Sequence, residues 1–212
     1  NMMFEQLRAD LPGTFNSTIN DKGNTVYDRV LIASGYRDAT NQERVYNNTI
    51  KEMGEDIGKY YASLPYYSEH HTGLAMDLKI YTCKGATVDF SADQQMWMKE
   101  NCAKYGFVLR YDGAKFNYTQ ILHESWHFRY VGIPHAAYMN EHNLCLEEYV
   151  DLITNEYNYN NKPLEYSFDG IDYLIYYYPA DLTESVTFVP VPGNNYTISG
   201  NNMAGYIVTV TK

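Results

Sequence analysis

Alternating apolar and polar positions predict a small set of strands in the first two thirds of the chain. The run 29–33 is short and apolar and precedes a Ser-Gly turn signal, which is typical of a buried strand. Residues 74–80 alternate, as expected for a strand with one buried face. Segments 107–111 and 121–132 are rich in aromatic and β-branched residues, so we expect two further strands there.

Apolar residues at helical spacing predict helices between these strands. The clearest helices are expected at about 41–58, 91–105 and 144–153. Ser91 is placed to cap the second of them, because its hydroxyl can accept a hydrogen bond from an otherwise unpaired backbone N–H. Pro134 is placed to open another helix, since its missing N–H costs nothing in a first turn.

The pattern changes near Asn155. A polar, Asn-rich stretch is followed by short alternating runs, 171–178, 185–191, 196–200 and 205–210, which are separated by turn signals. We therefore expect an α+β main domain at 1–156, with a small, mostly antiparallel sheet and helices packed on one side. A small β-rich C-terminal module or extension is expected at 157–212.

Composition and charge narrow the function classes. A chain of 212 residues can bury one core, and we expect it to be a monomer. The net charge of -10 and the pI near 5.0 disfavour nucleic acid as a partner, since phosphates require clustered Lys and Arg. No apolar run reaches the roughly 20 residues that span a bilayer. The chain opens on Asn1 without a basic, apolar leader, so we expect any signal peptide or membrane anchor to lie outside it.

The cysteines leave the redox compartment undecided. Cys83, Cys102 and Cys145 form no C-x-x-C pair, and an odd number leaves at least one thiol unpaired. A disulfide between two of them stays open at this point.

Three side chains stand out as candidate metal ligands: His70, Asp77 and His127. Two imidazoles and one carboxylate suit a catalytic zinc ion, which keeps a fourth position for water. Glu124 lies three residues before His127 and could accept a proton from that water. Side chains three apart in a strand normally face opposite ways, so a bend must bring Glu124 to the metal. Taken singly, each of these residues would also suit a surface or a hydrogen-bonding role.

Two segments that contain these residues, SEHHTGLAMD and HESWHFRYVG, resemble the signature blocks of the VanY-type D-alanyl-D-alanine carboxypeptidases. The family patterns are S-x-H-x-x-G-x-A-x-D and E-x-W-H-x-R-Y-V-G. The matching residues are Ser68, His70, Gly73, Ala75, Asp77, Glu124, Trp126, His127, Arg129, Tyr130, Val131 and Gly132. A third feature, S-G-Y-R followed by Gln, is matched at 34–37 and Gln42. Three blocks in the same order make the resemblance specific, over roughly residues 25–150.

The resemblance implies a role for each matched residue. His70, Asp77 and His127 would bind Zn2+, and Glu124 would be the general base. Arg37 would face the substrate, where its guanidinium can grip a carboxylate or stabilise developing negative charge. The alternative for Arg37 is a surface salt bridge.

Other positions near these blocks carry smaller expectations. Ser68 and Gln42 are expected to support substrate binding, and Trp126 to pack under the ligand strand or to form a substrate platform. His71 stands where relatives often have Gln, and His123 flanks the expected base. Neither matches a ligand position, so we interpret both as neighbours of the site.

The resemblance implies a D,D-peptidase or hedgehog-like fold in which 1–156 is the catalytic domain. The expected activity is hydrolysis of the terminal D-Ala of peptidoglycan stem peptides, at the extracellular or cell-envelope face of a bacterium. L,D-carboxypeptidases share the scaffold and act on the tetrapeptide stem, so that alternative stays open. A non-catalytic, zinc-containing wall-binding module is a third hypothesis, which the presence of Glu124 disfavours. The C-terminal segment could bind wall polymer, contact a partner or shield the core.

Overall fold

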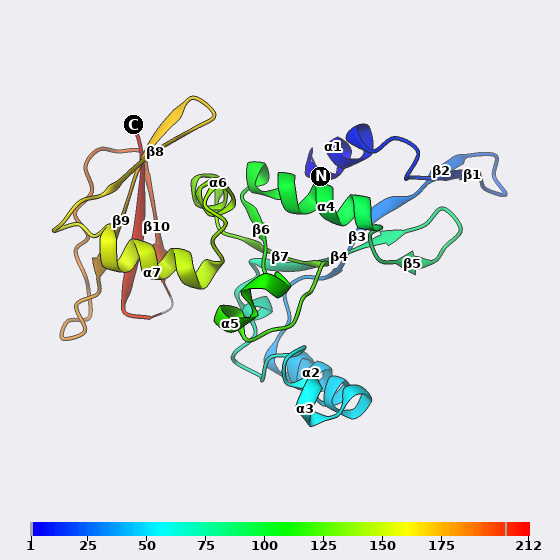
Figure 1. Ribbon diagram of the computed structural model, residues 1–212, viewed down its shortest axis with the longest axis horizontal. Helices are drawn as coiled ribbons and strands as arrows, with labels where there is room; N and C mark the ends of the chain where they lie inside the picture. The colour runs from blue at the N-terminus through cyan, green and yellow to red at the C-terminus, as the bar shows by residue number, and fades with distance from the viewer. Residues whose placement is uncertain (1, 202) are drawn as a thin grey trace. The chain divides into compact units, whose positions relative to one another are not determined.

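The computed structural model describes residues 2–201 and 203–212, which form two compact units that meet in sequence between Ala136 and Ala137 (Figure 1). The sequence placed the division twenty residues later, after residue 156, where the composition changes. Helix α7 (Leu146–Glu156) accounts for the difference, because it packs against strand β9 (Ile171–Pro179) within the second unit. By its packing, α7 therefore belongs to the second unit, whereas the composition of the chain assigned it to the first.

The first unit is built on an antiparallel sheet. Its strands follow the order β3 (Arg29–Ser34), β4 (Ala75–Tyr81), β7 (His127–Tyr130) and β6 (Phe107–Leu109), and β5 (Thr87–Val88) pairs with β4. The expected α+β class with an antiparallel sheet is confirmed. A separate hairpin of β1 (Ser17–Ile19) and β2 (Thr25–Tyr27), which the sequence did not predict, precedes β3.

One face of this sheet carries the apolar core. Helices α1 (Met2–Asp10) and α4 (Ala92–Asn101) lie on that face, above the sheet in Figure 1. The buried core residues are Met3, Leu7, Leu78, Ile80, Phe90, Trp97, Met98, Cys102 and Phe128. Helices α2 (Ala39–Met53) and α3 (Glu55–Gly58) lie below the sheet in the same view.

Local signals fix the ends of these helices. Ser91 caps α4 through a reciprocal capping box with Gln94, as its position predicted. The predicted helix 91–105 is α4 followed by a 3-10 turn, η2 (Cys102–Tyr105). Gly106 ends it with a φ of 81°, and a Cβ there would lie 2.7 Å from the ring of Tyr130, so only glycine fits.

The segment 121–132 is not one strand, and that part of the sequence prediction is wrong. Only β7 is extended, and a turn comes before it. The backbone N–H of His127 donates to the carbonyl of Glu124 at 3.2 Å, and the N–H of Glu124 donates to Tyr111 at 3.0 Å. These bonds bend the chain. The bend follows η3 (Gly113–Lys115) and α5 (Phe116–Thr119) in the sequence. The bend that the expected base requires is therefore present.

The second unit is a four-stranded antiparallel sheet. Its order is β10 (Tyr196–Gly200), β11 (Gly205–Thr211), β9 and β8 (Leu164–Phe168). Helix α6 (Ile133–Glu141) crosses the division between the units, and α7 follows it. Tyr176, Val208 and Val210 form the buried centre of this unit.

The predicted strand 185–191 is not formed, and β8 was not expected. Pro190 has no N–H to donate to a ladder, which disfavours a strand at that run. Val189 and Val191 nevertheless pack against the core of the second unit. Val186 and Phe188 of the same run are 60% and 87% exposed, so the apolar pattern predicted burial correctly for only part of the run and strand pairing incorrectly.

The described residues can be checked for membrane-spanning helices and for disulfide bonds. The helices of 2–201 and 203–212 are all too short or too polar to cross a bilayer. Cys83, Cys102 and Cys145 are free thiols, so the disulfide that the sequence left open is absent.

Candidate metal centre

The pairing of β4 with β7 places two of the three expected ligands side by side. Asp77 and His127 are direct partners in the ladder, so their side chains leave the same face of the sheet. Strand alternation sends Leu78 and Phe128 to the opposite face, into the core. His70 comes from η1 (Glu69–Thr72), a 3-10 turn just before β4, which ends at Gly73 with a φ of 72°. Local backbone structure therefore brings the three residues to one place.

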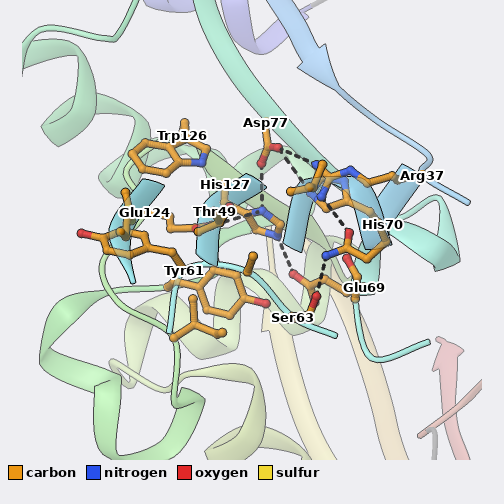
Figure 2. A pocket seen from close by; sticks show the side chains of 17 residues that line it. Arg37, Thr49, Tyr61, Ser63, Glu69, His70, Asp77, Glu124, Trp126 and His127 are labelled. Carbon is orange, nitrogen blue, oxygen red and sulfur yellow. Dashed lines mark hydrogen bonds and ion pairs between the residues drawn. The ribbon is translucent and has the colours of Figure 1, made fainter. Parts of the chain in front are cut away.

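The three side chains converge on a small volume. His70 Nε2 lies 3.3 Å from Asp77 Oδ2, and His127 Nδ1 lies 2.9 Å from Asp77 Oδ1. His70 donates from Nδ1 to the carbonyl of Gly35 at 2.7 Å, which leaves Nε2 facing Asp77. Figure 2 shows Asp77 at the top of the site, with dashed lines to His127 below it and toward the Arg37 and His70 side chains on its other side. Of the side chains in 2–201 and 203–212, these form the group that could hold a metal ion, with ligand atoms within 4.8 Å of one another.

This donor set fits zinc. Ligand atoms about 2.0 Å from a tetrahedral ion lie about 3.3 Å apart, close to the separations of the two imidazole nitrogens from Asp77. Both imidazoles are buried, with 4% of each residue exposed, as a structured site requires. Two neutral nitrogens and one carboxylate leave one coordination position for water or substrate.

Glu124 lies beside this group because of the turn before β7. Its Oε2 is 3.6 Å from His127 Nδ1, and only 7% of the residue is exposed. Burial raises the pKa of Glu124 to about 8, and the negative charges of Asp77 and Glu69 act in the same direction. A carboxyl group with a pKa near neutrality can both accept and return a proton.

Glu69 is a buried partner of the site that the sequence analysis missed. Its carboxylate accepts hydrogen bonds from His127 Nε2 at 2.7 Å, Arg110 Nε at 3.1 Å and Arg129 Nη1 at 2.7 Å. Burial disfavours its charge, but these bonds and the two guanidinium groups outweigh burial and lower its pKa to about 2. Because Glu69 holds the proton on Nε2, Nδ1 is the nitrogen of His127 that faces Asp77 and the metal position.

Both ring nitrogens of His127 therefore form hydrogen bonds to carboxylates, Nδ1 to Asp77 and Nε2 to Glu69. Burial disfavours its charged form, but the hydrogen bonds to Asp77 and Glu69 outweigh burial and raise its pKa to about 9. The pKa of Asp77 is held below its usual range, since the bonds and charges of His127 and His70 outweigh burial. With this raised pKa, His127 carries a proton on Nδ1 as well as on Nε2, and a metal ion that binds at Nδ1 must displace the proton there.

Arg37 also lies in the site. Its guanidinium donates to Gln42 Oε1 and to Ser34 Oγ, each at 2.8 Å, and its Nη2 lies 3.4 Å from Asp77 Oδ2. Gln42 is almost completely buried and donates from Nε2 to the carbonyl of Ser63 at 2.6 Å. Gln42 thus connects Arg37 to the segment around Ser63.

The residues line one pocket of about 380 Å³. The polar residues that line it include the three ligands, Glu124, Glu69, Arg37, Gln42 and Ser68. The remaining lining comes from Val45, Thr49, Met53, Tyr61, Ala62, Ser63, Tyr111, Ile121 and Trp126. Trp126 lines the pocket near Glu124 in Figure 2, and its ring also lies 5.0 Å from Nζ of Lys79 on the ligand strand β4, so neither expected placement is excluded.

The two other histidines near the motifs lie outside the ligand group. His123 contacts the carbonyl of Tyr111 through Nδ1 at 3.1 Å. His71 lies between the carbonyl of Arg37 and the backbone N–H of Tyr66. Their interpretation as neighbours of the site agrees with these contacts.

Two imidazoles and two carboxylates that converge from an antiparallel sheet on one pocket form a candidate metal site of the kind that zinc hydrolases use. The chain belongs to the VanY family, described as D-alanyl-D-alanine carboxypeptidase, whose model matches residues 10–133. The resemblance seen in the sequence motifs is therefore confirmed.

Individual relatives extend this likeness to the rest of the chain. A D-alanyl-D-alanine carboxypeptidase of Enterococcus faecium is 40% identical over 205 residues, which cover 96% of this chain and 61% of that protein. The chain thus spans about three fifths of that relative's length. The crystal structure of the D,D-dipeptidase VanXYg with a D-Ala-D-Ala phosphinate analogue matches 100% of this chain and 78% of its own, with 34% identity and a TM-score of 0.80.

A second crystal structure bears on the metal. A mutant of the D,D-pentapeptidase VanY in complex with Zn(II) is 25% identical, with a TM-score of 0.52, over 64% of this chain and 89% of its own.

Proposed function

We propose that the chain is a zinc-dependent D-alanyl-D-alanine carboxypeptidase that removes the terminal D-Ala from peptidoglycan stem peptides. The observation that carries this proposal is the convergence of His70, Asp77 and His127 beside buried Glu124. Family membership and the E. faecium relative support the same activity. His70 Nε2, an Asp77 oxygen and His127 Nδ1 would hold the ion.

The ion, when bound, supplies positive charge that acidifies a water molecule and polarises the scissile carbonyl. Glu124 takes the proton from that water on its carboxylate and returns it to the leaving amine. Its pKa of about 8 in the buried site means that its carboxylate is more basic than that of an exposed glutamate. A neighbouring dication would lower this pKa and so favour the charged form that can accept a proton at neutral pH.

Arg37 explains why the reaction would occur at a chain end. Its guanidinium donates hydrogen bonds to Ser34 and Gln42, and its side chain lines the pocket and is 15% exposed. A planar guanidinium pairs well with a carboxylate, so a free C-terminus would be favoured over an internal peptide bond. Gln42 would act by holding Arg37, and Ser68 by lining the pocket beside the ligands.

We infer that the protein acts at the extracellular or cell-envelope face of a bacterium, with the peptidoglycan stem peptide as partner, because the proposed substrate is found there. The likeness of the whole chain to the dipeptidase VanXYg supports free D-Ala-D-Ala as a second candidate substrate. An L,D-carboxypeptidase would instead act on the tetrapeptide stem.

Release of D-alanine from three substrates tests the proposal. The zinc-loaded protein is incubated with a stem pentapeptide, the matching tetrapeptide and D-Ala-D-Ala. We expect the pentapeptide to be cleaved with the highest kcat/KM. Preference for the tetrapeptide would identify an L,D-carboxypeptidase, and preference for the dipeptide a dipeptidase. No release from any of them, with zinc bound, would favour a wall-binding module.

Glu124→Gln tests the general base. The substitution keeps the shape of the side chain and removes its ability to accept a proton, so zinc should stay bound while kcat falls by about 100-fold or more. Glu100→Gln, at an exposed position of α4, is the matched control and should leave kcat unchanged. Retained turnover in Glu124→Gln would show that another group is the base.

A further inference from the structure

The backbone of the Gly35–Arg37 segment forms hydrogen bonds with two neighbouring histidines, His70 and His71. His70 donates from Nδ1 to the carbonyl of Gly35 at 2.7 Å, and the backbone N–H of Arg37 donates to the carbonyl of His70 at 3.2 Å. His71 completes the set, because its Nδ1 lies 2.5 Å from the carbonyl of Arg37. Both backbone polar groups of Arg37 are therefore paired with the turn that carries the ligand His70.

The second nitrogen of His71 is used as well. The backbone N–H of Tyr66 donates to His71 Nε2 at 3.0 Å. An imidazole that accepts at Nε2 carries its proton on Nδ1, and that proton is the one the carbonyl of Arg37 accepts. One neutral tautomer satisfies both contacts. His71 therefore has no lone pair left to offer to a metal ion.

Tyr66 has an unusual backbone at this contact. Its φ is 70°, in the left-handed region that a bulky residue adopts only when its surroundings impose it. The residue as a whole is 84% exposed, so burial does not impose this conformation. The hydrogen bond to His71 is a direct restraint on the backbone of this residue.

His71 thereby connects two parts of the pocket wall. One is the Arg37 segment, and the other is the segment that runs from Ser63, which lines the pocket, to Tyr66. Gln42 joins the same two parts from inside the pocket, through Arg37 Nη1 and the carbonyl of Ser63. Arg37 and Ser63 both appear in Figure 2, on the His70 side of the site. Arg37 is thus restrained at its side chain by Gln42 and at its backbone by His71.

We propose that His71 is a positioning residue that sets Arg37 to recognise the free terminal carboxylate of the substrate. This inference rests on the proposed function, since it needs Arg37 to face that carboxylate. His71 acts through Arg37 and does not touch the substrate. Glutamine at this position can also donate from an N–H and accept at an oxygen, whereas leucine can do neither.

Ligand binding without turnover tests the proposal. Zinc-loaded Glu124→Gln protein is titrated with D-Ala-D-Ala and with its C-terminal amide, and the titration is repeated after adding His71→Leu or His71→Gln. With His71 intact, the acid should bind more tightly than the amide. We expect His71→Leu to weaken acid binding by about tenfold with little effect on the amide, and His71→Gln to recover most of that loss.

Zinc affinity measured by chelator competition is the control, and it should change little in either His71 variant. The proposal is overturned if His71→Leu keeps the preference for the acid, or if His71→Gln binds as poorly as His71→Leu. The tautomer supplies a readout independent of any substrate: in ¹⁵N-histidine-labelled protein, His71 should carry its proton on Nδ1. A proton on Nε2 would also overturn the proposal. Absence of D-alanine release by the wild-type enzyme would count against the proposed function alone.

Discussion

The two faces of the central sheet in the first unit are made by the same strands and serve opposite purposes. On one face Leu78 and Phe128 are almost completely buried against α1 and α4. On the other face their sequence neighbours Asp77 and His127 meet at the metal position. The apolar face stabilises the fold through burial, whereas the polar face buries charges at a cost in solvation.

This difference shows how a rigid site can be built in few residues. The core holds β4 and β7 in register, and that register alone sets the separation of Asp77 from His127. The polar face then depends on pairing, since Glu69 and Asp77 each contact more than one positively charged or hydrogen-bonding partner. Substitutions on the two faces should therefore separate metal binding from stability.

The largest effect is expected from Asp77→Asn on the polar face. Asparagine keeps the size of the side chain but loses the negative charge that a zinc ligand supplies. Zinc affinity should fall by more than about 100-fold, because changing residues that merely contact a ligand already costs 10- to 100-fold. Chelator competition measures this, and circular dichroism checks that the variant is folded. Unchanged zinc affinity would remove Asp77 from the ligand set.

Leu78→Ala is the matched substitution on the apolar face, one residue along the same strand. The free energy of unfolding should fall by about 2–5 kcal/mol, because the side chain is fully buried and leaves a cavity. Denaturant unfolding of the metal-free protein measures this loss. Zinc affinity of the folded fraction should stay within about threefold of wild type. A large loss of affinity would mean that the two faces are not independent.

Glu69→Gln should have a smaller effect on the polar face. Glutamine can still accept a hydrogen bond from His127 Nε2, but it no longer makes the imidazole more basic or neutralises Arg110 and Arg129. Zinc affinity should fall by about 10- to 100-fold. Glu100→Gln serves again as the surface control, and an effect as small as that control would contradict the assigned role of Glu69.

The pH at which zinc affinity is measured sharpens this test. In the wild-type protein the pKa of His127 is about 9, so protons compete with zinc below that pH. Affinity should fall by about tenfold per pH unit as the pH decreases from 9. Removing the charge of Glu69 lowers this pKa and relieves the competition. The difference between Glu69→Gln and wild type should therefore be largest near pH 9 and smaller near pH 7.

Most of the site could be predicted from the sequence because its residues belong to ordered motifs. The alternation around Asp77 identified its strand, and the motif containing His127 identified the second ligand. Sequence spacing could not show how Glu124 reaches the metal position, because that depends on a turn closed by the hydrogen bond from His127 to Glu124. The sequence therefore predicted that the chain must bend near Glu124, but it did not predict which hydrogen bonds close the bend.

Glu69 could not be found in the same way. It is adjacent to His70, and its role depends on Arg110 of the segment after β6 and on Arg129 of β7, which converge only in the folded chain. The domain boundary differed for a similar reason, because α7 packs with the second unit despite its position before the change in composition. Local pattern thus predicted elements and motif residues, while long-range packing determined their partners.

X-ray absorption at the zinc edge of the zinc-loaded protein tests the metal centre most directly. His70, Asp77 and His127 predict a shell of nitrogen and oxygen only, with outer-shell scattering from two imidazoles. Sulfur in the shell, or scattering from fewer than two imidazoles, would contradict the proposed coordination.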